Sequence, residues 1–139
     1  IGHGVITTPP NSEICSRLEE IYTDMLALID KFKPDAAAVE ELFFVQNTTT
    51  GIPVAQARGV ILLALTQKKI PVFEYTPLQV KQSVTGYGRA EKKQIMYMVK
   101  TLLRLASEPK PDDTADALAI AICHAHSGAS RLASYYNKP

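Results

Sequence analysis

Short apolar or β-branched stretches alternate with longer helical patterns along this chain, and this alternation limits the possible folds more than any other feature. Residues 3–8, 35–42 and 71–75 have the length and residue types of strands, and a proline borders or opens each of them. Between and after them, apolar residues recur at helical spacing. Such an order is typical of an α/β layer with parallel central strands. We therefore predict an α/β fold in which 35–42 is a buried strand.

Five helices are predicted from capping residues, breaks and periodicity. Asn11 and Ser12 are candidate caps for a helix that ends near Phe32, before a proline. Thr76 and Pro77 have the residue types of a helix cap and a first turn. The predicted helices run from the cap at 11–12 to about 32, over 53–69, from 76 to the glycines at 86–88, over 90–107, and from 112 to about 127, with a polar loop at 46–51.

The composition is that of one soluble globular domain spanning residues 1–139. The chain has 139 residues, of which 46% are hydrophobic and 21% charged, which excludes a disordered tail and a disulfide scaffold. Its longest apolar runs, at 59–65 and 115–123, are shorter than the roughly 18 residues that span a bilayer. No basic and apolar leader opens it, and its two cysteines lack C-x-x-C spacing. We expect a cytoplasmic protein without membrane contact.

Positive charge is concentrated in one segment, although the net charge is only +1. Between residues 81 and 104 a single acid, Glu91, stands among six bases. A basic stripe of this kind suits phosphate contacts, because neutralised phosphates release condensed counterions. A solvated helix face is the alternative interpretation. The six bases are Lys81, Arg89, Lys92, Lys93, Lys100 and Arg104.

Three acids are the candidates for chemistry. Glu40 stands near the carboxyl end of the strand predicted at 35–42, where ligands bind in open α/β sheets. Asp113 and Asp116 are three residues apart at the start of the last helix and therefore share a face. A hard cation such as Mg²⁺ would neutralise such carboxylates. The alternatives are a helix cap for Asp112 or Asp113, a solvated Asp116, and Glu40 or Glu41 as a strand-end charge that faces water.

The chain resembles the RuvC family of Holliday-junction resolvases from about Gly2 to His126. Four segments carry the resemblance in the family's order: PDAAAVEELFF at 34–44, VAQARGVILLAL at 54–65, PVFEYTPLQVKQSVTGYGRAEKKQI at 71–95 and DDTADALAIAICHAH at 112–126. The resemblance implies an RNase H-like (retroviral-integrase-like) fold with a central mixed sheet, and a homodimer. It also implies Mg²⁺-dependent paired nicking of opposed strands at four-way DNA junctions, with ligatable 5′-phosphate and 3′-hydroxyl ends.

The resemblance also assigns residues. It implies that Glu40, Asp113 and Asp116 are catalytic and hold metal, two Mg²⁺ ions per site with Mn²⁺ as a substitute. Phe43 matches an aromatic residue near the junction centre, and Lys81 and Lys92 match basic residues that contact DNA. We expect Arg89 and Lys93, in the same basic segment, to contact DNA as well. The Q-A-R-G residues at 56–59 match the dimer interface, and the family works beside a RuvA–RuvB motor.

The sequence departs from the family pattern at its beginning. The family opens with a strand that carries an aspartate in a G-x-D-P-G motif, then a second strand, and residues 2–8 match the third. We therefore expect the first two strands to be absent, the metal site to lack one ligand and this exact chain to be inactive. A non-catalytic binder of branched DNA is one rival hypothesis. A related RNase H-like nuclease acting on another substrate is a second, and the match of Phe43 and Lys81 argues against it.

Overall fold

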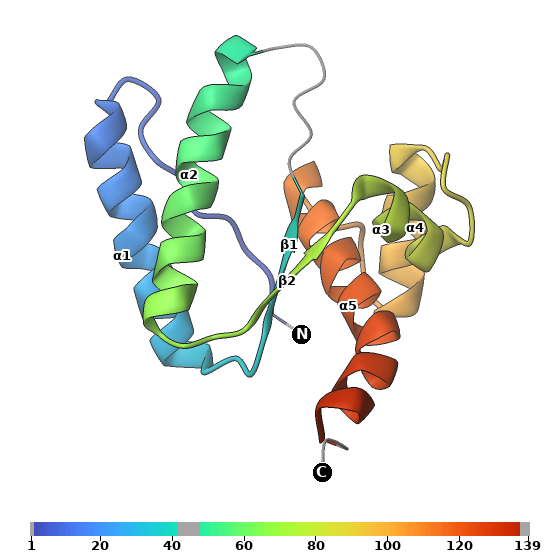
Figure 1. The fold of residues 1–139 in the computed structure, drawn as a ribbon. Helices are drawn as coiled ribbons and strands as arrows, with labels where there is room; N and C mark the ends of the chain where they lie inside the picture. Colours follow the sequence, from blue (N-terminus) through green and yellow to red (C-terminus); the bar gives the residue numbers. More distant parts are fainter. Residues whose placement is uncertain (1, 42–47, 137–139) are drawn as a thin grey trace. The chain divides into compact units, whose positions relative to one another are not determined.

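The computed structural model describes residues 2–41 and 48–136, and it describes their side chains except at 48–50 and 128–136. Its helices and strands alternate first and are then followed by helices alone (Figure 1). The elements are α1 (Ile14–Phe32), β1 (Ala37–Glu40), α2 (Thr48–Gln67), β2 (Val72–Tyr75), α3 (Pro77–Thr85), α4 (Lys92–Leu102) and α5 (Asp112–Tyr136).

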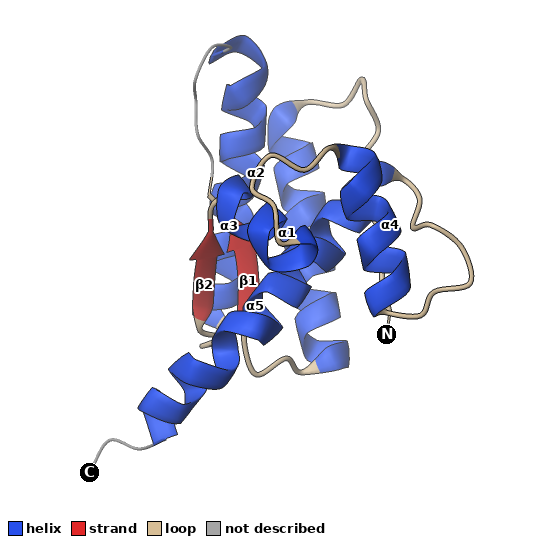
Figure 2. Ribbon diagram, turned by 90° about the vertical axis from the view of Figure 1, so that its right-hand side faces the viewer, coloured by secondary structure: helices blue, strands red, loops and turns tan. Residues whose placement is uncertain are grey.

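The two strands are hydrogen-bonded neighbours in one small sheet (Figure 2). The amide of Ala37 donates to the carbonyl of Pro71 at 2.9 Å. Four residues further along both strands, the amide of Glu41 donates to the carbonyl of Tyr75 at 2.9 Å. The register offset is the same at both ends, so the strands run parallel, as the connection through a helix requires.

The chain groups into two compact units. The α1–α2 unit contains described residues 6–37 and 48–73, and the α3–α5 unit contains residues 2–5, 38–41 and 74–136. In the α1–α2 unit the two helices pack against each other, with Ile29 of α1 and Ala64 and Leu65 of α2 buried. Asp30 of α1 and Lys68, the residue directly after α2, form an exposed ion pair with an Nζ–Oδ1 distance of 2.6 Å.

Helix α5 is the centre of the α3–α5 unit and packs against both α3 and α4. Its buried residues follow the helical repeat, so one face is covered while the neighbouring face stays accessible. The side chains that fill this core are Val80 and Val84 from α3, Ile95 and Val99 from α4, and Ala115, Leu118, Ala119, Ile122 and Cys123 from α5.

Helix α3 begins as predicted, with Thr76 as its cap. The Thr76 hydroxyl accepts from the amide of Gln79 at 3.1 Å, and the Gln79 side chain accepts from the amide of Thr76 at 2.9 Å. This capping box satisfies two amides that the helix itself leaves without partners.

The cap makes a measurable contribution to stability. Thr76→Ala is expected to lower the free energy of unfolding by about 1 kcal/mol, because the amide of Gln79 loses the hydroxyl that accepts its hydrogen bond. Urea denaturation would measure the loss. Thr101→Ala, at an exposed threonine within α4, is a control that should stay within about 0.5 kcal/mol of the unchanged protein. Equal losses for the two variants would contradict the assignment.

One predicted strand is absent from the structure, and a second is shorter than predicted. Residues 3–8 are not a strand, because among the described residues they have no ladder partner. The strand predicted at 35–42 is shorter, Ala37–Glu40, and it is half-buried with an exposed end rather than buried. The sheet of the described chain therefore has two strands, not three.

Helix ends also differ from the predictions. Helix α1 ends at Phe32 as predicted but begins at Ile14, and Ser12 bonds to the carbonyl of Pro9 instead of capping it. Helix α2 begins at Thr48, inside the predicted loop. Helix α4 ends at Leu102, five residues before the predicted end, where Arg104 adopts a positive φ of 52°. Helix α5 continues to Tyr136, beyond the predicted end.

None of the helices that the structure describes is long and apolar enough to cross a membrane.

The organisation of residues 1–139 as a single domain stays a prediction.

Candidate active site

Glu40 and Asp116, which are 76 positions apart in the sequence, line the same small hollow in the α3–α5 unit. Its volume is about 130 Å³, and Lys81 of α3 lies at it too. The remaining lining is apolar and comes from α3, α4 and α5: Pro77, Val80, Ile95, Ala119 and Ile120. Two carboxylates and a lysine thus meet at a mostly apolar surface, where water screens charge less than it does on an open surface.

Local structure explains both positions. Glu40 is the last residue of β1, and the backbone bond from Glu41 to Tyr75 holds the strand just beyond it. On α5, Asp113, Asp116, Ile120 and His124 follow one another at intervals of three or four residues, so they form a stripe beside the buried face. The predicted common face of the two aspartates is therefore the face that borders the hollow.

The electrostatics of the pair are unfavourable in the absence of a cation. Although Glu40 as a whole residue is exposed, burial of its carboxyl group and then the negative charge of Asp116 raise its pKa above the usual 4.5. The raised pKa means that the folded protein binds this proton more tightly than the unfolded chain does. Stability that Glu40 contributes below pH 4.5 is consequently lost as the pH rises from 4.5 through the folded-state pKa.

Glu40→Gln is therefore expected to stabilise the protein at neutral pH. The gain should be below about 1 kcal/mol because Glu40 is partly solvated, and it should vanish below about pH 4, where glutamate is mostly protonated in both states. Thermal unfolding of both proteins across this pH range, with EDTA present, would measure it. Millimolar MgCl₂ should then stabilise the unchanged protein more than the variant. A variant that is less stable at about pH 7 would contradict the raised pKa that burial and the charge of Asp116 give Glu40.

Lys92, the first residue of α4, contacts two of the acids on α5. Its Nζ lies 3.2 Å from Oδ2 of Asp116 and 3.6 Å from Oδ2 of Asp112. The hydrogen bond to Asp116 raises the pKa of Lys92, and the charges of Asp112 and Asp113 act in the same direction. These side chains are half exposed, so the ion pairs add little to stability. Their effect is to hold the ammonium group of Lys92 beside the hollow.

The donor set fits a hard divalent cation in part. Glu40 and Asp116 supply carboxylate oxygens, the ligands that Mg²⁺ prefers, and a cation would offset the burial and the charge of Asp116 that raise the pKa of Glu40. Asp113 is exposed in the first turn of α5 and does not line the hollow. Within residues 2–41 and 48–136, no group of three His, Cys, Asp or Glu side chains is arranged to hold a metal ion.

The other predicted site residues lie at different distances from the hollow. Lys81 lines it, and Lys92 reaches Asp116 beside it. Arg89 is exposed in the loop before α4, and Lys93 lines a second hollow in the same unit. Phe43 lies outside the described residues.

Some features of the site gave no signal in the sequence. The phenol oxygen of Tyr75, at the end of β2, lies 2.8 Å from Nδ1 of His124 on α5, and the two rings meet edge to face. This contact joins the sheet to the helix that carries Asp116. Asp112 is the second ion-pair partner of Lys92. The sequence indicated Asp112 only as a possible helix cap, and not as a partner of Lys92. The apolar lining from three helices had none, because it depends on tertiary packing.

Comparison with known proteins identifies the family to which the chain belongs. The family model for crossover junction endodeoxyribonucleases, RuvC, matches residues 1–124. The chain therefore belongs to the RuvC family, and the predicted RNase H-like fold and family resemblance are confirmed.

Individual relatives agree with the family model. The crossover junction endodeoxyribonuclease RuvC of Halothermothrix orenii is 58% identical over 127 residues, which are 91% of this chain and 77% of the relative. The RuvC of Desulfitobacterium hafniense is 62% identical over 120 residues, 86% of this chain and 73% of the relative. Among solved structures, Thermus thermophilus RuvC in complex with a Holliday junction substrate matches with a TM-score of 0.87 and 37% identity, over 92% of this chain and 78% of that one.

Proposed function

We propose that this protein is a structure-specific endonuclease that resolves four-way DNA junctions in recombination and repair. It would make paired symmetric nicks in opposed strands and leave 5′-phosphate and 3′-hydroxyl ends that a ligase can join. The observation that carries the proposal is the meeting of Glu40, Asp116 and Lys81 at one hollow, with Lys92 in contact with Asp116, in a chain of the RuvC family. Acids and bases at one place suit the hydrolysis of a phosphodiester.

We propose Mg²⁺ as the cofactor, two ions per site, with Mn²⁺ as a substitute. Glu40 and Asp116 would hold it, and Asp113 would join them from the first turn of α5. When bound, the metal supplies Lewis-acid activation of the phosphate and of an attacking water. The support is the carboxylate pair at the hollow and the repulsion between its members.

The basic residues would bind and orient the DNA. Lys92 is placed to neutralise charge that develops on the reacting phosphate, and Lys81 to hold the strand beside it. Arg89 and Lys93 would contact phosphates further along the DNA, and Phe43 would stack on a base at the junction centre.

A non-catalytic binder of branched DNA is the second candidate. It is favoured by one observation, the absence of a group of three metal-binding side chains among the described residues. No residue of the sequence matches the family's G-x-D-P-G aspartate. We therefore propose that residues 1–139 alone cleave junctions weakly or not at all, and that adding this acid restores cleavage.

A cleavage assay separates the two candidates. End-labelled mobile four-way junctions would be incubated with the 139-residue chain and with a version that carries the family's opening strands, in MgCl₂ or in EDTA. Paired nicks at symmetric positions, from the extended version and only with MgCl₂, are the expected result. Tight junction binding without cleavage by either version would overturn the nuclease and support the binder. Linear duplex of the same sequence is the control substrate.

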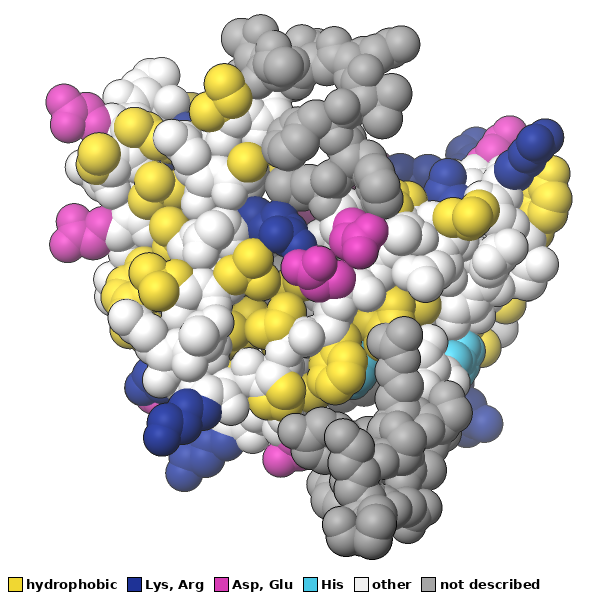
Figure 3. All heavy atoms as spheres, viewed as in Figure 1, with side chains coloured by type: hydrophobic (Ala, Val, Ile, Leu, Met, Phe, Trp, Pro, Cys, Tyr) yellow, Lys and Arg dark blue, Asp and Glu magenta, His cyan; other side chains and the backbone are white. Residues whose placement is uncertain are grey.

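We also propose a homodimer, formed through the exposed side of α2. Ile52, Gln56, Gly59 and Leu63 are all exposed and are spaced four, three and four residues apart, which places them on one stripe. Hydrophobic side chains are exposed over α1 and α2 in Figure 3. Gly59 has no atom within 4 Å of the position where a Cβ would be, so nothing in the described chain requires a glycine there. A closely approaching second helix would require it.

Gly59→Leu tests the dimer. Leucine is the better helix former by somewhat less than about 1 kcal/mol, so α2 itself should become more stable. The added side chain should nevertheless weaken the dimer at least about tenfold by blocking close approach. Sedimentation velocity would measure the association, and Thr23→Leu, at an exposed position of α1, is the control. A Gly59→Leu protein that remains as dimeric as the unchanged one would contradict this interface.

The cellular setting follows from the family resemblance alone. We propose that the protein acts in the cytoplasm on junctions that a RuvA–RuvB complex moves. Co-sedimentation with a RuvA–RuvB–junction complex would test the association.

A further inference from the structure

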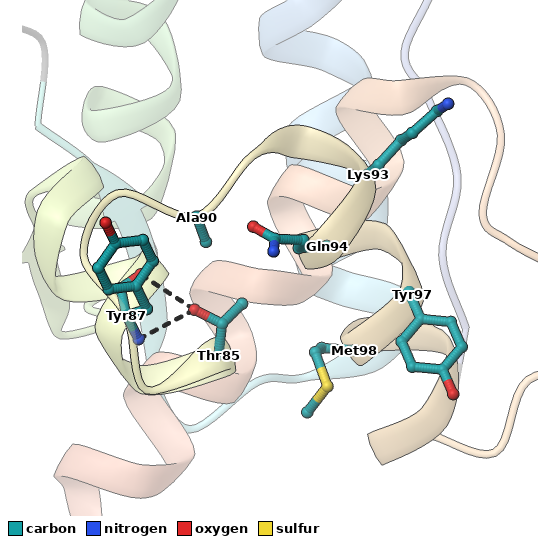
Figure 4. Close-up of a pocket in the computed structure, with 7 residues that line it drawn as sticks. All are labelled: Thr85, Tyr87, Ala90, Lys93, Gln94, Tyr97 and Met98. Atoms are coloured by element: carbon teal, nitrogen blue, oxygen red, sulfur yellow. Dashed lines mark hydrogen bonds between the residues drawn. The ribbon is translucent and has the colours of Figure 1, made fainter.

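A second hollow, outside the candidate active site, lies between the loop at 86–91 and helix α4 (Figure 4). Its volume of about 370 Å³ is in the range of small-molecule sites. Thr85 and Tyr87 line one side, and Gln94 and Met98 of α4 line the other. Tyr97 lies further along α4 and is 62% exposed. The hollow therefore combines aromatic, amide and thioether groups.

The backbone of Tyr87 is fixed by its neighbours. The Thr85 hydroxyl accepts from the amide of Tyr87 at 3.1 Å, and the carbonyls of Lys81 and Tyr87, at 2.8 Å and 3.0 Å, share its single proton (Figure 4). Gly86 has a φ of 75°, which favours glycine, and its amide donates to Gln82 at 2.8 Å. A Cβ on Gly88 would lie 2.5 Å from Cδ1 of Leu78, so this residue is also closely packed.

The side chain of Tyr87 is nevertheless 58% exposed. An exposed aromatic ring on a firmly held backbone can serve as a stacking surface for a ligand. Because a tyrosine has few rotatable bonds and this loop is already ordered, a ligand that stacks on the ring would lose little affinity to ordering.

Gln94 adds directed hydrogen bonding. Its side-chain oxygen accepts from the amide of Glu91 at 2.8 Å, which fixes the orientation of the amide group. The amide nitrogen makes no hydrogen bond within the described part of the chain, and Figure 4 shows the group on the side of Tyr87. Two N–H donors near an aromatic ring match a flat ligand that carries acceptor atoms.

The charge around the hollow is suited to an anionic ligand. Lys93 lines it and extends outward at its edge in Figure 4, and Arg89 is exposed in the same loop. No acidic residue lines the hollow among the described residues. The neighbouring residue Lys92 reaches the acids of the candidate active site, so adjacent lysines of α4 serve the two places.

We propose that this hollow holds an unstacked nucleobase of bound DNA, with Tyr87 as the stacking surface, Gln94 as hydrogen-bond donor and Lys93 on a neighbouring phosphate. The inference rests on the proposed function in taking DNA as the ligand. It does not require cleavage. Thr85 and Lys81 are four residues apart on α3, about 6 Å along the helix axis. A DNA strand bound at the hollow of Glu40 and Asp116 can therefore continue to this second hollow.

Binding of a labelled single-stranded oligo(dT) of about twelve nucleotides, and of a four-way junction, tests the proposal by fluorescence anisotropy in EDTA. Tyr87→Ala should weaken oligo(dT) binding by about tenfold or more, whereas Tyr87→Phe, which keeps the ring, should stay within about threefold. Tyr87→Ala should leave the salt dependence unchanged, and Lys93→Gln should reduce the slope of log K against log salt by about one phosphate contact. Phe32→Ala, at an aromatic residue of α1 that is 64% exposed, is the matched control.

Two outcomes would overturn the proposal. Tyr87→Ala that binds both probes like the unchanged protein would exclude stacking in the hollow. Equal weakening by Tyr87→Ala and Phe32→Ala would show a non-specific effect of losing a surface aromatic. Either result can coincide with normal Mg²⁺-dependent cleavage, and a protein that never cleaves can still show the expected series. Failure of this inference is therefore distinguishable from failure of the proposed function.

Discussion

In the version that carries the family's opening strands, Glu40→Gln is expected to abolish junction cleavage while the protein still binds the junction. Glutamine keeps the shape of the side chain but removes the charge that would hold a divalent cation at the hollow. Loss of that charge should lower the single-turnover cleavage rate by about 10²–10⁴-fold, because metal-assisted stabilisation of the transition state contributes several kcal/mol. Single-turnover cleavage of a labelled junction in excess MgCl₂ would measure the rate, and anisotropy in EDTA would measure the binding.

The adjacent residue is the matched control for this variant. Glu41→Gln makes the same chemical change one position later, and Glu41 does not line the hollow. Its backbone amide bond to Tyr75 does not involve the side chain and remains. Cleavage by Glu41→Gln should stay within about threefold of the unchanged protein. Cleavage by Glu40→Gln at a normal rate would remove Glu40 from the active site, and an equal loss in both variants would show that net charge alone is responsible.

In the same extended version, Asp116→Asn is expected to stop cleavage and, unlike most active-site substitutions, to tighten junction binding in EDTA. Cleavage should fall about 10²-fold or more because the second carboxylate of the hollow is lost. Binding should become a few-fold tighter, because a negative charge near the phosphate is removed and Lys92 loses the partner that lies 3.2 Å from its Nζ. Anisotropy titrations at two salt concentrations would measure the change.

Asp112→Asn distinguishes the two acids that contact Lys92. Asp112 lies 3.6 Å from Nζ of Lys92 but does not line the hollow. Its substitution should leave cleavage within about threefold and cost about 0.5 kcal/mol of stability, because an acid in the first turn of α5 is favourable there. If Asp112→Asn impaired cleavage as strongly as Asp116→Asn, the ion pair with Lys92 rather than the hollow would be the important feature.

Local sequence signals predicted those features that depend on neighbours along the chain. Thr76 caps α3 because its hydroxyl and the Gln79 side chain are three residues apart, which is a local relation. The end of α1 at Phe32 before Pro34 and the position of Glu40 at the end of β1 are likewise local. The common face of Asp113 and Asp116 follows from the helical repeat alone. Family membership was also readable from the order and spacing of four segments, and the family model confirms it.

Features that depend on non-local partners were mispredicted or missed. Residues 3–8 have the composition of a strand, but a strand exists only where another strand pairs with it, and the described chain provides none there. Helix α4 has helix-forming residues beyond Leu102, yet the chain leaves the helix there. The Tyr75–His124 contact joins residues 49 positions apart, which no periodicity reveals.

The sequence by itself therefore determined the kinds of residue available for chemistry, their placement at element ends and the family. The tertiary structure decided which of them meet. It brings Glu40 and Asp116 to one hollow and Lys92 to Asp116, leaves Asp113 outside the hollow, and places Tyr87 and Gln94 at a second hollow. The physical reason is that helical and strand periodicities act over a few residues. The distance between side chains on different elements depends instead on how α5 packs against α3 and α4.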